Sequence, residues 1–231
     1  MYLDDILIAS MTFHEHIQHI REVFARLRTA GLRLKPRKCL FLHDEVPYLG
    51  HLISAQGLQP DPSKTEKVRI CSTPHDVTTV HQFIGLTYCW RFVPNFSSIA
   101  SPLCALTKKN VTFQWTDECQ TAFDYLKRML TTAPILLAYP NFGPDAEFVL
   151  ETDASGAGLG AIPSQQQGDG MLHPIAYASR SLDPSERNYG ITELETLTVV
   201  WAAHYFRPYL LGHRTIVYTD HSACVSVLSS T

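Results

Sequence analysis

The chain has 231 residues, of which 45% are hydrophobic and 18% are charged, and its formal net charge is −3. This composition excludes an intrinsically disordered protein and allows one large domain or two small ones. No run of eighteen apolar residues is present and no signal-peptide pattern opens the chain, so neither a transmembrane helix nor a secretory leader is expected. The six cysteines form no C-x-x-C pair, which predicts reduced thiols in an intracellular protein.

Charge is distributed unevenly along the chain. The last hundred residues carry ten acidic and four basic side chains, whereas the region before them is mildly basic. Seven basic residues fall between Arg21 and Lys38, where Glu22 is the one acid. Such a cluster suits a nucleic-acid phosphate backbone, and the alternative is an ordinary solvated helix face.

Residues 12–30 are predicted to form a helix. Thr12 followed by Glu15 matches a capping box, and Gly31 is a typical helix stop. Apolar residues recur between them at helical spacing, namely Ile17, Ile20, Phe24 and Leu27. The HEHIQH stretch lacks the H-E-x-x-H spacing of a zinc site, so its histidines are expected to be exposed.

Short strands and then helices are expected after this first helix. LRLKPRKCLF and VPYLGHLIS predict strands, each interrupted by a proline, and AQGLQPDPSK predicts a turn. Residues 63–130 predict mostly helix, with the last helix running from Thr116-Asp117 to Leu130. Prolines are expected to stop the helices of this region, at Pro74, Pro94 and Pro102. The stretch APILLAYPNFGPD then marks the expected domain boundary.

Beyond this boundary, strands and a long helix alternate, which predicts an α/β unit. Strands are expected in EFVLETDAS, MLHPIAYASRSL and RTIVYTD, a helix over residues 191–207, and a hairpin turn in SQQQGDG. GAGLGA, from Gly156, satisfies the dinucleotide-binding pattern G-x-G-x-x-A. Pro163 and the turn after it argue against the helix that such a site requires, so a small-residue strand or turn is expected instead.

Asp4 and Asp5 stand side by side in an apolar, strand-like stretch. Neighbouring side chains of a straight strand point to opposite faces, so the pair can share a site only where the strand bends, as at a hairpin tip. Two carboxylates at such a tip suit Mg²⁺, which prefers oxygen ligands. The alternative is an ordinary Asp-Asp turn.

Asp153 and Asp220 each lie at the end of a predicted strand in the acidic part of the chain. Asp153 is expected to face away from Phe148 and Leu150. Acidic residues within apolar stretches need partners, and a pair of Mg²⁺ ions would supply them. The alternative is a pair of surface acids at strand ends.

A third carboxylate is expected from the helix over residues 191–207, where two glutamates compete. One apolar face of this helix is formed by Leu194, Leu197, Trp201 and Tyr205. Glu193 and Glu195 flank this face on opposite sides. The side that carries Glu195 is also apolar, so a carboxylate there is expected to serve a site, which favours Glu195.

Several stretches, taken in chain order, resemble the Pol polyproteins of gypsy-class retrotransposons and related retroviruses. YLDDILIAS resembles the Y-x-D-D motif of reverse transcriptases, and YLGHLISAQGL is similar to the end of their palm. QFIGLTYCWRFVPNFSSIASPLCALTKK and FQWTDECQTAFDYLKRMLTTAPIL resemble the thumb and connection. LETDASGAGLGA, NYGITELETLTVVWAAHYFRPYLLG and VYTDHSA resemble the ribonuclease H domain.

The resemblance covers essentially the whole chain and implies a mixed α/β (α+β) fold. A palm hairpin remnant is expected in residues 1–60 and a mostly helical thumb and connection in residues 61–140. Residues 141–231 are expected to form a ribonuclease H-like mixed sheet with helices, truncated at its C-terminal end.

The resemblance also implies a chemistry. The ribonuclease H site would hydrolyse the RNA strand of an RNA–DNA hybrid with two Mg²⁺ ions, or Mn²⁺, held by Asp153, Glu195 and Asp220. Helices of this family carry a small alanine seven residues after the glutamate, which here selects Glu195 with Ala202.

Asp4 and Asp5 are the implied metal ligands of an RNA-directed DNA polymerase. That site also needs an upstream aspartate and nucleotide-binding fingers, which this sequence lacks, so no polymerase activity is expected of this chain alone. The family's ribonuclease H extends to a further helix and a fourth metal-binding aspartate. Eleven residues follow Asp220 here, so weak or lost hydrolysis is expected.

The implied partners are the RNA–DNA hybrid, a primer–template duplex and the rest of the Pol polyprotein, including fingers, palm and integrase. The implied location is a cytoplasmic particle or the nucleus. The duplex backbone would follow Arg21–Lys38, a primer-grip-like turn at Gly50–Gly57, and helical basic residues, namely Lys64, Lys67, Arg91, Lys108 and Lys109. The competing hypotheses are a non-catalytic nucleic-acid-binding remnant and a degenerate reading frame without a selected function.

Overall fold

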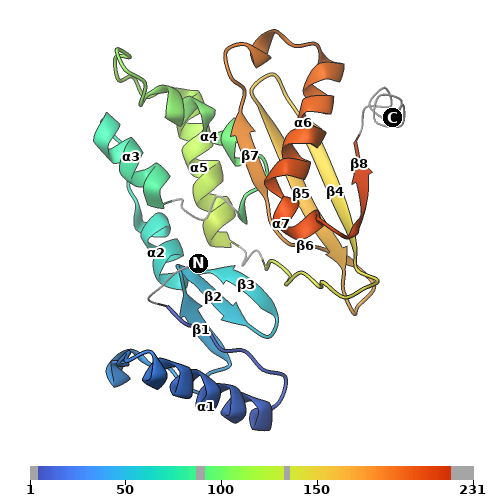
Figure 1. The fold of residues 1–231 in the computed structure, drawn as a ribbon. Helices are drawn as coiled ribbons and strands as arrows, with labels where there is room; N and C mark the ends of the chain where they lie inside the picture. The colour runs from blue at the N-terminus through green and yellow to red at the C-terminus, as the bar shows by residue number, and fades with distance from the viewer. Residues whose placement is uncertain (1–4, 87–91, 133–135, 220–231) are drawn as a thin grey trace. The chain divides into compact units, whose positions relative to one another are not determined.

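The structure is a computed structural model that describes residues 5–86, 92–132 and 136–219 (Figure 1). The chain forms two compact units that divide between Ala55 and Gln56. Both units mix helices and strands, so the expected mixed α/β class is confirmed. Among the described residues, no helix is both long enough and apolar enough to cross a bilayer.

The first unit begins with α1 (Phe13–Thr29), which confirms the expected helix. Thr12 Oγ1 accepts a hydrogen bond from the Glu15 backbone N–H at 3.3 Å, and the Thr12 N–H donates to the Glu15 carboxylate at 3.2 Å. This capping box satisfies backbone donors that the first helical turn leaves open. Gly31 follows the helix with a φ of +70°, a conformation that glycine adopts without strain.

The strand expected in LRLKPRKCLF is wrong. The chain forms a short 3₁₀ helix there, η1 (Pro36–Lys38), because Pro36 fixes φ and offers no N–H to a ladder. VPYLGHLIS forms two strands, β1 (Glu45–Tyr48) and β2 (His51–Ser54), which pair antiparallel. The two residues between them both have positive φ, as a type I′ hairpin turn requires.

The second unit starts with β3 (Gly57–Pro60) and continues with four helices. These are α2 (Pro62–Ile70), α3 (Val77–Leu86), α4 (Phe96–Ala105) and α5 (Asp117–Thr132). They pack around a core whose most buried side chains are at most 2% exposed, among them Val68, Val80, Phe83, Leu103, Phe123 and Leu126. The burial of these side chains holds the helical layer together.

Pro102 does not stop a helix, contrary to expectation, because α4 runs through it to Ala105. Ala100 and Leu103, on either side of the proline, are fully buried in the helical core. Their packing stabilises a helical conformation that proline alone would weaken.

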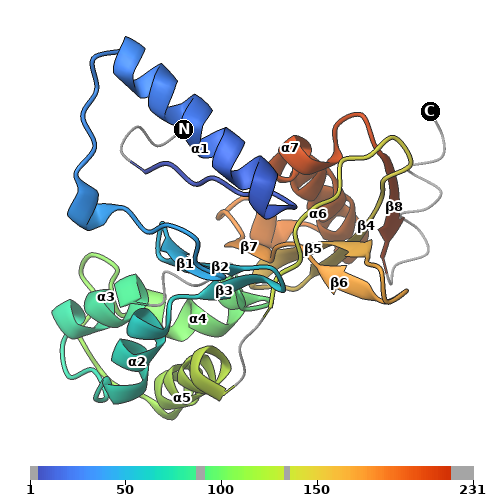
Figure 2. The same cartoon turned by 90° about the horizontal axis from the view of Figure 1, so that it is seen from below.

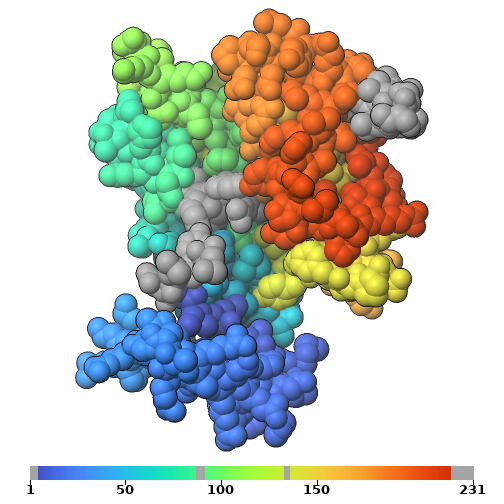
Figure 3. Space-filling model, in the orientation of Figure 1, coloured from blue at the N-terminus to red at the C-terminus, as the bar shows by residue number. Residues whose placement is uncertain are grey.

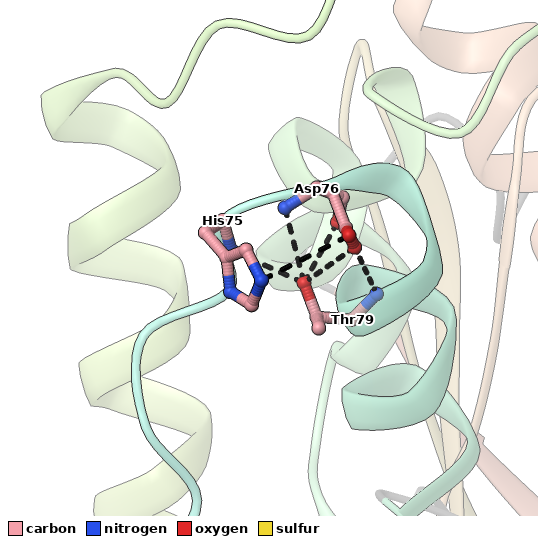
Figure 4. A network of polar contacts seen from close by, with 3 residues as sticks. All are labelled: His75, Asp76 and Thr79. Carbon is pink, nitrogen blue, oxygen red and sulfur yellow. Dashed lines mark hydrogen bonds and ion pairs between the residues drawn. The ribbon is translucent and has the colours of Figure 1, made fainter.

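α3 begins at a polar cap in which three residues take part (Figure 4). Asp76 Oδ1 accepts from the Thr79 backbone N–H at 2.7 Å, and Thr79 Oγ1 accepts from the N–H groups of His75 and Asp76, each at 3.1 Å. Because hydrogen bonds favour the ionised carboxylate, chiefly the one from Thr79 N–H, the pKa of Asp76 is lowered.

A five-stranded sheet follows, with strand order β6-β5-β4-β8 and β7 paired to β5. The strands are β4 (Glu147–Ala154), β5 (Gly158–Gln166), β6 (Leu172–Pro174), β7 (Ala178–Ser181) and β8 (Arg214–Tyr218). MLHPIAYASRSL therefore supplies two short strands rather than the single one expected. β6 pairs with the last part of β5 and ends at Pro174, and β7 starts at Ala178 and pairs with the first part of β5.

Pro163 lies inside β5, at the point where its partner changes from β7 to β6. The Pro163 carbonyl accepts from the Ile175 N–H at 2.8 Å, in the gap between β6 and β7. The nitrogen and the carbonyl of a residue in an antiparallel strand point to the same side, so the Pro163 nitrogen also faces this gap. A proline costs little there, because the ladder needs no N–H from this position.

Helices cover both faces of this sheet. On one face lies α6 (Ile191–Tyr205), followed by α7 (Arg207–Leu210), and the outer side of α6 forms part of the surface in Figure 3. Leu150 of β4 packs with Ala202 of α6 in one buried cluster. On the other face, α4 lies against β5 and β7, as Figures 1 and 2 show.

The described part of the stretch APILLAYPNFGPD, residues 136–145, makes several contacts with the strands around it. Leu58 and Leu137 exchange backbone hydrogen bonds of 2.9 and 3.0 Å. The buried Gln165 side chain accepts from the Asn141 N–H at 2.7 Å and donates to its carbonyl at 2.9 Å. These contacts help to join the helices and the sheet in one compact unit. The division at residues 60 and 140 stays a prediction.

Candidate functional site

Asp153 is the next-to-last residue of β4, a strand that lies between β5 and β8. Its side chain is exposed, whereas Phe148 and Leu150 are at most 1% exposed, so Asp153 faces away from them as expected. Strand alternation therefore places Leu150 on the α6 side of the sheet and Asp153 on the α4 side.

Asp153 accepts a hydrogen bond from a residue that was not among the predicted site residues. Asn95 Nδ2 donates to Asp153 Oδ2 over 3.0 Å. Asn95 is the N-cap residue of α4 and has a left-handed backbone, with φ 51° and ψ 30°. The sequence signal was weak, because Asn after Pro94 predicts a helix start but not its partner across the fold.

Glu195 and Glu193 have different surroundings on α6. Glu193 is exposed, and its Oε2 accepts from the Gly190 N–H at 2.7 Å, so it caps the helix N-terminus. Glu195 is only 2% exposed, although a carboxylate is costly to bury. The two glutamates thus differ in the way that the helical-face argument predicted.

β8 runs parallel to β4 with a fixed register, in which Phe148 pairs with Thr215 and Glu151 with Tyr218. Thr152 Oγ1 also donates to the Tyr218 carbonyl, at 3.3 Å. Asp220 follows Tyr218 by two positions in the sequence, as Asp153 follows Glu151, but Asp220 lies outside the described residues.

Asp5 is exposed, and its backbone carbonyl accepts from the Tyr48 hydroxyl at 3.2 Å. Asp4 lies outside the described residues, so the geometry of the Asp4–Asp5 pair stays a prediction. Across residues 5–86, 92–132 and 136–219, no three His, Cys, Asp or Glu side chains form a group that could hold a metal.

GAGLGA forms the turn into β5 and the first part of that strand, so the dinucleotide-binding alternative is wrong, as argued from Pro163. Its glycines serve packing instead. A Cβ on Gly160 would collide with Asn95 Oδ1, and one on Gly158 would lie 2.6 Å from the Arg180 carbonyl oxygen. Glycine at position 160 lets α4 approach the sheet closely, and glycine at position 158 lets the β7 backbone approach β5.

The basic residues named for duplex binding are exposed wherever the structure describes them. All seven between Arg21 and Lys38 are exposed, and Arg26 pairs with Glu22 one turn away. Lys64 and Lys67 of α2 are exposed too. Lys108 and Lys109 are also exposed, but they lie in the turn after α4 and not in a helix as expected, and Arg91 lies outside the described residues.

Two family models match the chain. One is described as reverse transcriptase (RNA-dependent DNA polymerase) and matches residues 1–53. The other is described as an RNase H-like domain found in reverse transcriptase and matches residues 115–217.

Similar curated proteins are retrotransposon polyproteins. The retrovirus-related Pol polyprotein from transposon 412 of Drosophila melanogaster is 39% identical over 96% of this chain and 18% of its own length. The one from transposon 297 of the same organism is 39% identical, again over 96% of this chain and over 20% of its own length. The transposon Tf2-3 polyprotein of Schizosaccharomyces pombe is 32% identical over 95% of this chain and 16% of its own length. The chain thus spans a fifth or less of these relatives.

Solved structures of a foamy viral protease-reverse transcriptase share the fold. The complex with double-stranded DNA is 25% identical, with a TM-score of 0.80 over 100% of this chain and 48% of that one. The complex with an RNA/DNA hybrid is 26% identical, with a TM-score of 0.79 over 96% of this chain and 30% of that one. With both family models matched in chain order, the chain belongs to the reverse transcriptase family of retroelement Pol polyproteins and carries reverse transcriptase and RNase H-like regions.

Proposed function

We propose that the sheet of the second unit carries a ribonuclease site that cleaves the RNA strand of an RNA–DNA hybrid. The observation that supports it most is the parallel β4–β8 register, which pairs Glu151 with Tyr218. Asp153 and Asp220 each follow one member of this pair by two positions in the sequence. Glu195, buried on the helix that packs against β4, is the third carboxylate of the proposal.

The three carboxylates would meet around the C-terminal end of β4. Asp153 faces the α4 side, and Glu195 comes from α6 on the opposite side. β4 ends at Ala154, one residue after Asp153, so side chains from both faces can approach each other beyond the strand end.

The donor set fits the proposed cofactor, Mg²⁺ or Mn²⁺, because both are hard cations that prefer carboxylate oxygens. Asp153, Glu195 and Asp220 would hold the ions. When bound, such ions activate a water oxygen and stabilise the leaving oxygen of a phosphodiester. The protein would contribute fixed carboxylate positions, since Asp153 lies on a paired central strand and Glu195 is held in a buried helix face.

The proposed substrate is supported by charge and by similarity. A foamy viral protease-reverse transcriptase of the same fold is described in complex with RNA/DNA hybrid, and another with double-stranded DNA. The exposed basic residues of Arg21–Lys38 and of the helical layer would contact duplex phosphates. Recognition would depend on duplex shape and the 2′-hydroxyl rather than on base sequence.

The first unit would be part of an RNA-directed DNA polymerase, with Asp4 and Asp5 as its metal ligands. The other parts of that site would come from the remainder of a Pol polyprotein, including its fingers and palm, and integrase is a further proposed partner. We expect no primer extension by this chain alone. The proposed location is a cytoplasmic particle or the nucleus.

A hybrid-cleavage assay with Asp153→Asn tests the proposal. The purified chain is incubated with a labelled RNA–DNA hybrid and Mg²⁺, and the wild type is expected to release short RNA products. Asp153→Asn should abolish this cleavage because a neutral amide replaces a metal-binding carboxylate. Asp145→Asn, a matched change at an exposed aspartate before β4, should leave it intact. Equal cleavage by Asp153→Asn would refute the site.

A non-catalytic nucleic-acid-binding remnant is the second candidate, and the exposed basic residues favour it as much as the first. It predicts hybrid binding that weakens with salt, but no cleavage by the wild type. If the chain neither bound nor cleaved the hybrid, the remaining hypothesis would be a degenerate reading frame without a selected function.

A further inference from the structure

We infer that Asn95 is a positioning residue for Asp153, through which α4 of the helical layer controls metal binding at the proposed ribonuclease site. The inference deepens the proposed function and rests on it. Its basis is the 3.0 Å hydrogen bond from Asn95 Nδ2 to Asp153 Oδ2, which joins residues 58 positions apart. A donor on one carboxylate oxygen restricts the rotation of that carboxylate and leaves the other oxygen for a ligand.

The backbone of Asn95 is held in an unusual conformation. Its φ of 51° and ψ of 30° lie in the left-handed region, which is sparsely populated by residues other than glycine, although asparagine tolerates it better than most. The surrounding structure must therefore stabilise it. Its carbonyl accepts from the N–H groups of Ser98 and Ile99, at 3.1 and 3.2 Å, so the same residue also starts the helix.

The sheet is shaped to receive the Asn95 side chain. Gly160 is the cross-strand partner of Asp153, and a Cβ on Gly160 would collide with Asn95 Oδ1. Any larger residue at this position would thus displace the amide from Asp153. This glycine has no positive φ that would explain it, so close approach is the physical reason for its small size.

Further contacts fix the start of α4 on the sheet. The Ser97 N–H donates to Ser179 Oγ of β7 at 2.9 Å, and Ser98 Oγ lies 3.4 Å from Ser155 Oγ, just beyond β4. A Cβ on Gly158 would lie 3.1 Å from Ser97 Oγ, so the helix start packs tightly there too. Because α4 is anchored on β5 and β7, Asn95 is presented to Asp153 by a rigid element.

A consequence for metal binding follows from this arrangement. Residues that hydrogen-bond a metal ligand orient it, and their loss typically weakens metal affinity or activity by about 10- to 100-fold. Asn95→Gly removes the amide and keeps the left-handed backbone, which glycine adopts freely. We therefore expect weaker metal binding without unfolding.

The experiment compares wild type, Asn95→Gly, Asp153→Asn and a matched control as full chains. Asn110→Gly is the control, because Asn110 is also exposed and also has a positive φ of 64°, but it follows α4 rather than preceding it. Mn²⁺ affinity is measured by calorimetry without nucleic acid, hybrid cleavage is measured as a function of Mg²⁺ concentration, and thermal unfolding is measured without metal.

We expect Asn95→Gly to weaken Mn²⁺ binding about tenfold or more and to raise the half-maximal Mg²⁺ concentration similarly. Its melting temperature and its cleavage rate at saturating Mg²⁺ should change much less, and Asn110→Gly should match the wild type. A second variant, Gly160→Ala, should reproduce the weaker binding with Asn95 intact, because its methyl group displaces the amide.

If Asn95→Gly bound Mn²⁺ as tightly as the wild type, the inference would be overturned. The same holds if the wild type did not bind Mn²⁺, or if Asp153→Asn still bound it. Failure of the proposed function is a separate result. It would be a wild type that binds Mn²⁺ through Asp153 but does not cleave the hybrid, and the affinity of Asn95→Gly would still decide the role of Asn95.

Discussion

At the scale of single residues, the two glutamates at the start of α6 show how a shift of two positions changes the role of a carboxylate. Glu193 is exposed and caps the helix by accepting from the Gly190 N–H. Glu195 is buried on the packed side of the same helix. Local sequence contains the reason, because helical periodicity separates the two faces by about 100° per residue.

This difference predicts opposite results for a matched pair of substitutions. Glu195→Gln should abolish hybrid cleavage with little loss of stability, because an amide of the same size replaces a proposed metal ligand. Glu193→Gln should keep cleavage and lower the free energy of unfolding by roughly 0.5 to 1 kcal/mol, through a weaker cap. Cleavage assays and chemical denaturation of both variants check this. If only Glu193→Gln abolished cleavage, Glu193 and not Glu195 would be the metal ligand from α6.

At the scale of elements, an ion pair connects β7 to the turn before α6. Arg180 binds the Glu186 carboxylate with two hydrogen bonds, of 2.6 and 2.8 Å, and its guanidinium lies 5.8 Å from the ring centre of Trp201 on α6. The hydrogen bond from Arg180, aided by that from the Asp183 N–H, lowers the pKa of Glu186 to about 2. The geometry is bidentate, which is the stronger form of such pairs.

The lowered pKa of Glu186 predicts an acid-sensitive contribution to stability. A carboxylate with a depressed pKa stabilises the fold above its unfolded pKa, near 4.5, and this contribution is lost as the pH falls toward 2. Glu186→Gln should lower the free energy of unfolding at pH 7 by roughly 1 kcal/mol. It should also flatten the fall in melting temperature between pH 5 and about pH 2.5.

Thermal unfolding across this pH range measures the effect, and Arg180→Met provides the complementary test from the other side of the pair. Both variants should show the same reduced pH dependence, because each removes the same interaction. A Glu186→Gln variant with the wild-type pH profile would show that the pair does not stabilise the protein.

At the scale of the whole molecule, the two units differ in how much they bury. Among the described residues of the first unit, only Ser54 is buried, and α1 contributes no buried side chain. Large apolar side chains there stay exposed, for example Phe13 at 68% and Leu32 at 62%. The second unit contains the helical core and the clusters between α6 and the sheet.

This difference predicts unequal local stability. Amide hydrogens of α1 should exchange at least about a hundredfold faster than those of α5, because few buried contacts oppose local opening of α1. Hydrogen exchange followed by mass spectrometry on the full chain measures both helices in one experiment. Equal protection of α1 and α5 would contradict the prediction.

Much of this protein was determined by local sequence. The capping box at Thr12, the strand that carries Asp153 and the helix that carries Glu195 were all predicted, because caps and periodicity act over a few residues. The strand expected around Pro36 and the stop expected at Pro102 were wrong. At Pro36 the fixed φ and the missing N–H of proline favoured a 3₁₀ helix over a strand, and at Pro102 core packing outweighed the preference of proline.

Only the tertiary structure decided what surrounds Asp153. The contact with Asn95 spans 58 positions and exists because α4 packs against β5, where Gly160 leaves room for the amide. No local pattern encodes such a contact, since it depends on the packing of two elements that are far apart in the sequence. The sequence by itself determined which carboxylates could carry chemistry, and the packing of α4 on the sheet determined how one of them is held.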